Sequence, residues 1–148
     1  MKRVLFVCIG NACRSQMAEG FARAYGSDVM IAASAGLGPA MKVARDTKKA
    51  MSEKGIDLRD HFPKAIRHLG RAQFDLVVNM SGSEILPDQV SGAQVIEWDV
   101  DDPVSMSYED HCKIRDRIET LVMKLVLDLR NQPREPRFRG QGSGRLEL

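Results

Sequence analysis

VLFVCIGNACRSQMAEG, residues 4–20, is the stretch that decides the fold of this chain. It opens with a short apolar run that is rich in branched and aromatic side chains, which predicts a buried strand ending at Cys8. A small polar loop follows. Apolar residues then recur every four positions from Met17 to Tyr25, which predicts a helix over 15–25. This order places the sulfur of Cys8 beside a helix N-terminus.

Segments typical of strands and of helices alternate along the rest of the chain. The expected strands are residues 28–33, 74–80 and 95–98, and the expected helices are residues 43–54, a short turn at 66–69 and a long helix that opens at Ser107. This alternation predicts an α/β fold, namely a single domain over 1–130 with a four-stranded parallel sheet and helices on both faces. Ligands in such folds bind beyond the C-terminal ends of the strands, where Cys8 lies.

Composition narrows the class of protein. The chain has 148 residues, 43% of them apolar and 28% charged, which is typical of one soluble globular domain. Its net charge of +2 lies in the Arg/Gly/Pro-rich residues 131–148, which we expect to form a disordered tail, so a nucleic-acid partner is not expected. We find no membrane-spanning segment and no signal peptide, and we expect a cytoplasmic protein.

The cysteines and histidines show no metal-binding pattern. Three cysteines is an odd number, which does not fit a secreted disulfide framework. No CxxC or CxxH spacing occurs, and the three histidines are scattered. We therefore expect neither a metal site nor an organic cofactor.

The residues after Cys8 suit a tetrahedral oxyanion such as phosphate, sulfate or arsenate. The first N–H groups of a helix lack internal partners, and the helix dipole favours negative charge there. Gly10 and Asn11 tolerate the left-handed backbone that curls a short loop around an anion. The residues expected to bind the anion and support a thiolate are Ile9, Gly10, Asn11, Ala12, Cys13 and Ser15.

The same electrostatic field favours the thiolate of Cys8, which is the nucleophilic form of a cysteine. Arg14 supplies a cation whose planar fork matches two anion oxygens, and Ser15 is placed to donate a hydrogen bond to the sulfur. We therefore expect Cys8 to act as a nucleophile with Arg14 beside it. Two interpretations of Cys13 stay open: a small buried side chain that packs the loop, or a partner of Cys8 in a disulfide formed under oxidation.

The string CIGNACRS after a VLFV strand, followed by QMAE, resembles the low-molecular-weight protein tyrosine phosphatase superfamily. That superfamily includes thiol-dependent arsenate reductases of the same fold, and the resemblance covers residues 1 to about 130. It implies a general acid in an Asp-Pro pair. Asp102 precedes a proline, whereas the neighbouring Asp99 and Asp101 do not. We expect Asp102 to protonate the leaving oxygen and then to activate water.

The resemblance also concerns residues behind the loop. It implies that Ser34 supports the loop together with Asn11, and that Glu19 either joins them or lies on the helix surface. Lys64 falls near the position where the reductases often have an acid that helps to bind a cation. We therefore expect no cation site there.

Cys8, Arg14 and Asp102 together imply a cysteine-dependent phosphomonoester hydrolase of the protein tyrosine phosphatase type. Such an enzyme works through a phosphocysteine, and a phosphotyrosine protein would be its substrate class. No cofactor is required.

Two alternatives remain. The first is an arsenate reductase, but Ser81 stands where thioredoxin-coupled members carry a resolving cysteine, and Cys112 in the long helix is expected to be structural. Such a reductase would have to use an external thiol. Val104 and Ser105 follow Asp-Pro, where the phosphatases usually carry aromatic residues, and this favours the reductase branch. The second alternative is an anion-binding regulatory module with little turnover.

Overall fold

The computed structural model describes residues 1–70, 72–85, 89–90 and 92–132. Strands and helices follow one another in the order that the sequence predicts. Their bounds are β1 (Lys2–Cys8), α1 (Arg14–Tyr25), β2 (Met30–Gly36), α2 (Arg45–Ser52), the 3-10 helix η1 (Ile66–Leu69), β3 (Leu76–Asn79), β4 (Gln94–Glu97) and α3 (Tyr108–Arg130). The tail predicted over 131–148 lies, from residue 133 onward, outside the described residues.

The strands form one parallel sheet in the order β2-β1-β3-β4, which confirms the predicted α/β class. β1 is a central strand, and its apolar sequence follows from burial on both faces of the sheet. From β1 the chain moves to β2 on one side and then crosses to β3 on the other, so the strand order reverses at β1. Open α/β sheets bind ligands in the crevice at such a reversal. The loop that follows Cys8 lies there.

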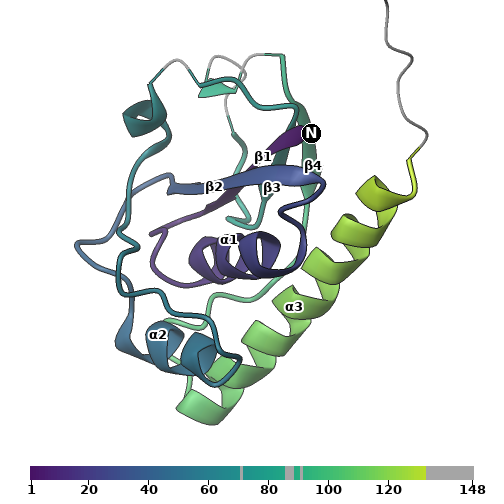
Figure 1. Ribbon diagram of the computed structural model, residues 1–148. Coiled ribbons are helices and arrows are strands. Elements are labelled where there is room, and N and C mark those ends of the chain that lie inside the picture. The colour runs from purple at the N-terminus through teal and green to yellow at the C-terminus, as the bar shows by residue number, and fades with distance from the viewer. Residues whose placement is uncertain (71, 86–88, 91, 133–148) are drawn as a thin grey trace, which may run out of the picture.

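Side chains of β1 alternate between two cores. Phe6 belongs to the larger core, which includes Phe21 of α1 and Ile118 of α3. Leu5 and Val7 belong to a smaller core on the opposite face, which η1 and the segments flanking β3 and β4 cover. Figure 1 shows α1 and α3 on one side of the sheet and η1 on the other. Within the described residues, the two faces are therefore covered unequally, since α1 and α3 pack on one face, whereas η1 and the segments flanking β3 and β4 cover the other.

Most elements differ from their expected bounds by one to three residues, and for two of them the structure shows the cause. β2 runs through Gly36 instead of ending at residue 33, because its parallel pairing with β1 continues as far as Cys8. α2 begins at Arg45 instead of residue 43. The N–H of Ala44 donates to the carbonyl of Ala12 at 3.1 Å, which ties this segment to the loop after β1 before the helix starts.

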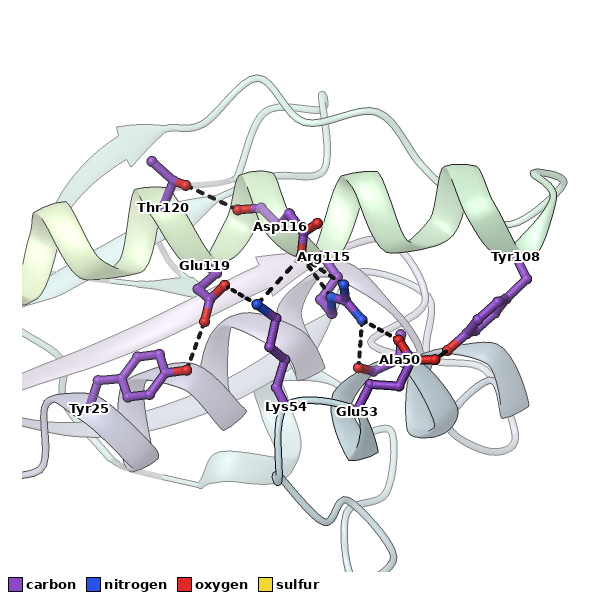
Figure 2. Close-up of polar contacts among 9 residues, drawn as sticks. All are labelled: Tyr25, Ala50, Glu53, Lys54, Tyr108, Arg115, Asp116, Glu119 and Thr120. Carbon is purple, nitrogen blue, oxygen red and sulfur yellow. Dashed lines mark hydrogen bonds and ion pairs between the residues drawn. The ribbon is translucent and has the colours of Figure 1, made fainter.

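A network of charged residues fixes α3 against α1 and α2. Arg115 is 7% exposed, and its Nη1 donates to the carbonyl of Ala50 and to the carboxylate of Glu53, both at 2.9 Å. Figure 2 shows the network, whose further members include Tyr25, Lys54, Tyr108, Asp116 and Glu119. Ser107 caps the helix by accepting the N–H of Asp110 at 3.1 Å. These contacts fix the start of α3, directly after the segment that carries Asp102. Within the described residues, no helix is both long enough and apolar enough to cross a bilayer.

Candidate active site

The loop between β1 and α1, residues 8–13 (the anion loop), is fastened to the protein through its carbonyl groups. Segment 37–44 donates backbone hydrogen bonds of 2.9–3.1 Å to it, from Leu37 to Cys8, from Gly38 to Ile9, from Ala40 to Gly10 and from Ala44 to Ala12. The carbonyls of Asn11 and Cys13 accept from the Gln16 side chain at 3.0 Å and from the N–H of Met17 at 2.9 Å.

The amide groups of the anion loop are left without protein partners. Among the described residues, the backbone N–H groups from Ile9 to Ser15 donate to no other protein group. Since the carbonyls are bonded to segment 37–44, these N–H groups remain available to donate to an anion. The N-terminus of α1 has no capping side chain and no acidic residue in its first turn, so its partial positive charge also faces the loop.

Gly36 lets the anion loop lie directly against β2. A Cβ at this position would lie 2.5 Å from the carbonyl oxygen of Ile9 and 2.9 Å from the backbone nitrogen of Asn11. Both are backbone atoms, which cannot swing aside as a side chain can. At Gly38, which also bonds to the loop, an added Cβ would meet no atom within 4 Å. Close approach of two backbones therefore explains the glycine at position 36.

Asn11 is the buried centre of the hydrogen-bond network behind the loop. It is fully buried and has a left-handed φ of 52°. Its Oδ1 accepts the N–H of Lys64 at 3.0 Å, and because a backbone N–H can only donate, this bond fixes the orientation of the amide. Nδ2 then donates to the hydroxyl of Ser15 at 2.6 Å and to that of Ser34 at 3.0 Å.

The two hydroxyls that accept from Asn11 keep their own hydrogens for other partners. Ser34 donates to the carboxylate of Glu19, which is 4% exposed and pairs with Arg23 at 2.6 Å. Ser15 is thereby left to donate to Sγ of Cys8 at 2.9 Å. An O–H that points at the sulfur stabilises negative charge on it. Of the two fates considered for Glu19, the structure places it in the network and not on the surface.

Lys64 lies behind the loop, where its Nζ donates to the carbonyl of Ser34 at 3.3 Å and lies 4.9 Å from the ring centroid of Phe62. Burial lowers the pKa of the Lys64 ammonium, and the nearby Glu19 carboxylate opposes this shift. Within the described residues, no group of three or more His, Cys, Asp or Glu is arranged to hold a metal ion. The expectation of no cation site here stays a prediction.

Arg14 is held by backbone carbonyls and is 5% exposed. Its Nη1 donates to the carbonyl of Met80 at 2.5 Å and to that of Val100 at 3.0 Å, which follow β3 and β4. Its Nη2 lies 3.5 Å from Oδ2 of Asp102. With Nη1 fully engaged, Nε and Nη2 form the edge of the guanidinium that remains for two oxygens of an anion.

Asp102 stands at the rim of the site, with its side chain 47% exposed. Its Oδ2 faces Arg14, and its Oδ1 accepts the N–H of Val104 at 3.1 Å, which closes a tight turn. Neither Asp99 nor Asp101 forms an ion pair with a described residue. The structure therefore brings the acid of the Asp-Pro pair to Arg14.

A hydrogen-bonded chain, which no sequence pattern indicates, connects Cys13 to the turn that carries Asp102. The Cys13 thiol bonds to Thr47, whose Oγ1 lies 3.0 Å from Nε2 of His111. His111 also donates to the carbonyl of Pro103. Burial lowers the pKa of His111 and raises the pKa of Cys13, so both side chains are uncharged near neutral pH.

Gln16 is a second residue that the sequence analysis missed. It is fully buried on the first turn of α1, where its Nε2 donates to the carbonyls of Asn11 at 3.0 Å and Phe62 at 3.2 Å. Its Oε1 accepts from Nδ1 of His61 at 2.9 Å, and burial lowers the pKa of that histidine. Gln16 thus ties the anion loop to segment 61–64. Its position directly after the motif is the only signal in the sequence.

The segment after β3 carries hydroxyl groups and no cysteine. Ser81 donates its hydroxyl to Oδ1 of Asn79 at 2.7 Å, and Asn79 also donates to Glu97 of β4 at 3.1 Å. Cys112, on α3, hydrogen-bonds to Tyr108. Cys8, Cys13 and Cys112 are all free thiols. This segment therefore supplies no second cysteine for a disulfide relay with Cys8.

Comparison with known protein families gives a match over most of the chain. The family model of the low molecular weight phosphotyrosine protein phosphatases matches residues 3–135. The chain belongs to this family. The resemblance carried by the CIGNACRS motif is thereby confirmed, and so is the fold that it implied.

Relatives within this family include reductases and phosphatases. The chain is 34% identical over 131 residues to the glutaredoxin arsenate reductase of Synechocystis sp., a match that covers 84% of this chain and 99% of that protein. An arsenate reductase solved in its phosphate binding state superposes with a TM-score of 0.79 at 31% identity, over 87% of this chain and 99% of that one. The low molecular weight protein tyrosine phosphatase of T. tengcongensis gives a TM-score of 0.74 at 32% identity, over 86% of this chain and 99% of that one.

Proposed function

We propose that this protein is an arsenate reductase that takes its electrons from an external thiol. The observation that carries the proposal is the match along 99% of the Synechocystis glutaredoxin arsenate reductase. The sequence motifs favour hydrolysis of a phosphomonoester, with arsenate reduction as the alternative. The relatives favour that alternative. The anion loop suits both reactions, because arsenate and phosphate are tetrahedral oxyanions of similar shape.

In the first step the thiolate of Cys8 attacks arsenic, and a bond between arsenic and oxygen breaks. Asp102 donates a proton to the departing oxygen, which leaves as water. The unpaired N–H groups of the anion loop and the free edge of Arg14 hold the other oxygens. Ser15 stabilises the attacking sulfur through the hydrogen bond described above.

In the second step a thiol loses its proton to Asp102, and its sulfur forms a bond with the sulfur of Cys8. The bond between Cys8 and arsenic breaks, and its electron pair stays on arsenic, which is reduced from the +5 to the +3 state and leaves as arsenite. Each sulfur gives up one electron. A second thiol then exchanges with the mixed disulfide and frees Cys8.

The electrons must come from outside because this chain offers no suitable second thiol. It has three cysteines. Cys13 is buried, protonated near neutral pH and bonded to Thr47. Cys112 lies on α3 against Tyr108, and Ser81 stands at the end of β3.

A second candidate function is hydrolysis of a phosphomonoester, which the family match and the T. tengcongensis phosphatase favour. The same residues would serve, since Cys8 would form a phosphocysteine and Asp102 would activate water to cleave it. The residues after Asp-Pro speak against an aromatic phosphoester, because the exposed Val104 and Ser105 offer no ring to stack on the substrate.

A side-by-side assay distinguishes these functions. Purified protein is given arsenate with a thiol, and separately an aryl phosphate, with Cys8→Ser as the control for both. Arsenite formation that requires Cys8 supports the proposal, whereas aryl phosphate turnover without arsenite formation supports the hydrolase. If neither product forms although phosphate binds, the protein is an anion-binding module and the proposal is wrong.

A further inference from the structure

We infer that a cavity beside Asp102 is the docking site of the electron donor, and that this donor is a small zwitterionic thiol; the inference rests on the proposed function. The cavity has a volume of about 280 Å³. Its walls come from the anion loop, the start of α2, the turn after Asp102 and α3, and they include Cys13, Arg45, Asp46, Pro103, Val104 and His111.

The position of the cavity suits a second substrate. One wall is Cys13, which belongs to the anion loop that would hold the arsenic, and another is the Pro103–Val104 pair directly after Asp102. Asp102 does not itself line the cavity, but it directly precedes Pro103, and both Asp102 and Cys8 lie near enough to the lining residue Cys13 to act electrostatically on its thiol. A thiol bound between these walls is therefore close to the carboxylate that must take its proton in the second step. Asp102 is half exposed and is in its basic form once it has protonated the leaving oxygen.

The charges at the mouth of the cavity indicate what kind of thiol would bind. Arg45 and Asp46 are neighbours in the first turn of α2, and both line the cavity. Neither side chain forms a hydrogen bond or an ion pair with another described residue, although the carboxylate of Asp46 acts electrostatically on His111. Arg115 and Arg130, in contrast, are paired with carboxylates. An unpaired cation beside an unpaired anion complements a ligand that carries both a carboxylate and an ammonium group.

The inner wall of the cavity is uncharged. His111 is neutral near pH 7 because burial lowers its pKa, and Cys13 is protonated because burial raises its pKa. Pro103 and Val104 add apolar surface. An uncharged inner wall suits the neutral S–H group of the ligand. The charged ends of the ligand stay at the rim with Arg45 and Asp46.

The test compares four thiols in steady-state arsenate reduction. Glutathione carries both charges, 3-mercaptopropionate carries only the carboxylate, cysteamine carries only the ammonium group, and 2-mercaptoethanol is uncharged. They are assayed with wild type, Arg45→Gln, Asp46→Asn and the control Lys124→Gln, which changes an exposed charge on the C-terminal half of α3. For each thiol the ratio of its KM in the variant to its KM in wild type is measured, so that differences in intrinsic reactivity cancel.

We expect the two variants to raise KM for different sets of thiols. Arg45→Gln raises KM about two- to fivefold for glutathione and 3-mercaptopropionate, and Asp46→Asn does so for glutathione and cysteamine. KM for 2-mercaptoethanol, KM for arsenate and all constants of Lys124→Gln stay at the wild-type values. S-methylglutathione, which cannot react, should compete with glutathione in wild type and compete more weakly in both variants.

The inference and the proposed function fail in different ways. If arsenate is reduced but Arg45→Gln and Asp46→Asn behave like Lys124→Gln with every thiol, the docking site is wrong and the reductase stands. If Cys13→Ser, correctly folded, abolishes turnover with all four thiols, the second sulfur is internal and the docking site is again wrong. If no thiol supports arsenite formation, the proposed function fails and the docking site falls with it.

Discussion

Replacing Gly36 by alanine should damage anion binding and catalysis far more than folding. The new Cβ would lie 2.5 Å from the carbonyl oxygen of Ile9 and 2.9 Å from the nitrogen of Asn11. Carbon and oxygen atoms in contact rarely approach closer than about 3.3 Å, so the anion loop must move by about 0.8 Å. A displacement of about 1 Å in a catalytic site costs about 100-fold in rate. The cost in stability of such overpacking is about 1–3 kcal/mol.

The assay combines phosphate binding by calorimetry, the steady-state rate with arsenate and a thiol, and urea unfolding. Gly38→Ala is the matched control, because it lies in the segment that bonds to the same loop and its Cβ would meet nothing within 4 Å. Gly38→Ala should bind phosphate and react as wild type does. Equal phosphate affinity in both variants and wild type would refute the reasoning, as would a loss of stability in Gly36→Ala with phosphate binding intact.

Three further predictions follow from the site. Asp102→Asn should lower kcat about 10²- to 10⁴-fold with phosphate binding retained, because an amide cannot transfer the proton, and a wild-type kcat would remove Asp102 from the mechanism. Asn11→Ala should lower the free energy of unfolding in urea by about 2–4 kcal/mol, since it deletes the bonds to Ser15, Ser34 and Lys64 and leaves alanine at a φ of 52°; a loss below about 1 kcal/mol contradicts its central role. Burial lowers the pKa of His61 and His111, so near pH 6.5 the unfolded chain binds protons that the folded chain does not. The contribution of these two histidines to stability should be constant above about pH 7 and fall as the pH drops below about 6.5. Urea curves over this range measure the slope, and an unchanged slope in His111→Gln would contradict the contribution of this residue.

The strands and helices were predictable where local pattern decides them. The apolar run of β1 follows from its central place in the sheet, and Ser107 marks the start of α3 as its N-cap. The ends of β2 and α2 were not predictable, because partners distant in the sequence set them. β2 extends to Gly36 through its pairing with Cys8, and α2 starts late because Ala44 bonds to Ala12.

The residues of the site also fall into those that a local pattern predicts and those that depend on partners distant in the sequence. Cys8, Arg14 and Ser15 lie in one short motif, and Asp102 is recognisable as the acid before a proline, so the sequence predicts them. Gln16 and His111 act through partners far along the chain, namely Phe62 and Pro103, and no local pattern predicts such contacts. The reason for a glycine at 36 is likewise visible only once two backbones are seen to touch.

The attachment of residues 8–13 to segment 37–44 has a consequence for protein engineering. Backbone bonds fasten the outer side of the anion loop, and the exposed side chain of Ile9 takes no part in them, so replacements at Ile9 should be well tolerated. Grafting the motif onto another scaffold requires both segments as one unit. A chimera that received the first without the second would leave four carbonyl acceptors facing water and would lose the shape of the anion loop.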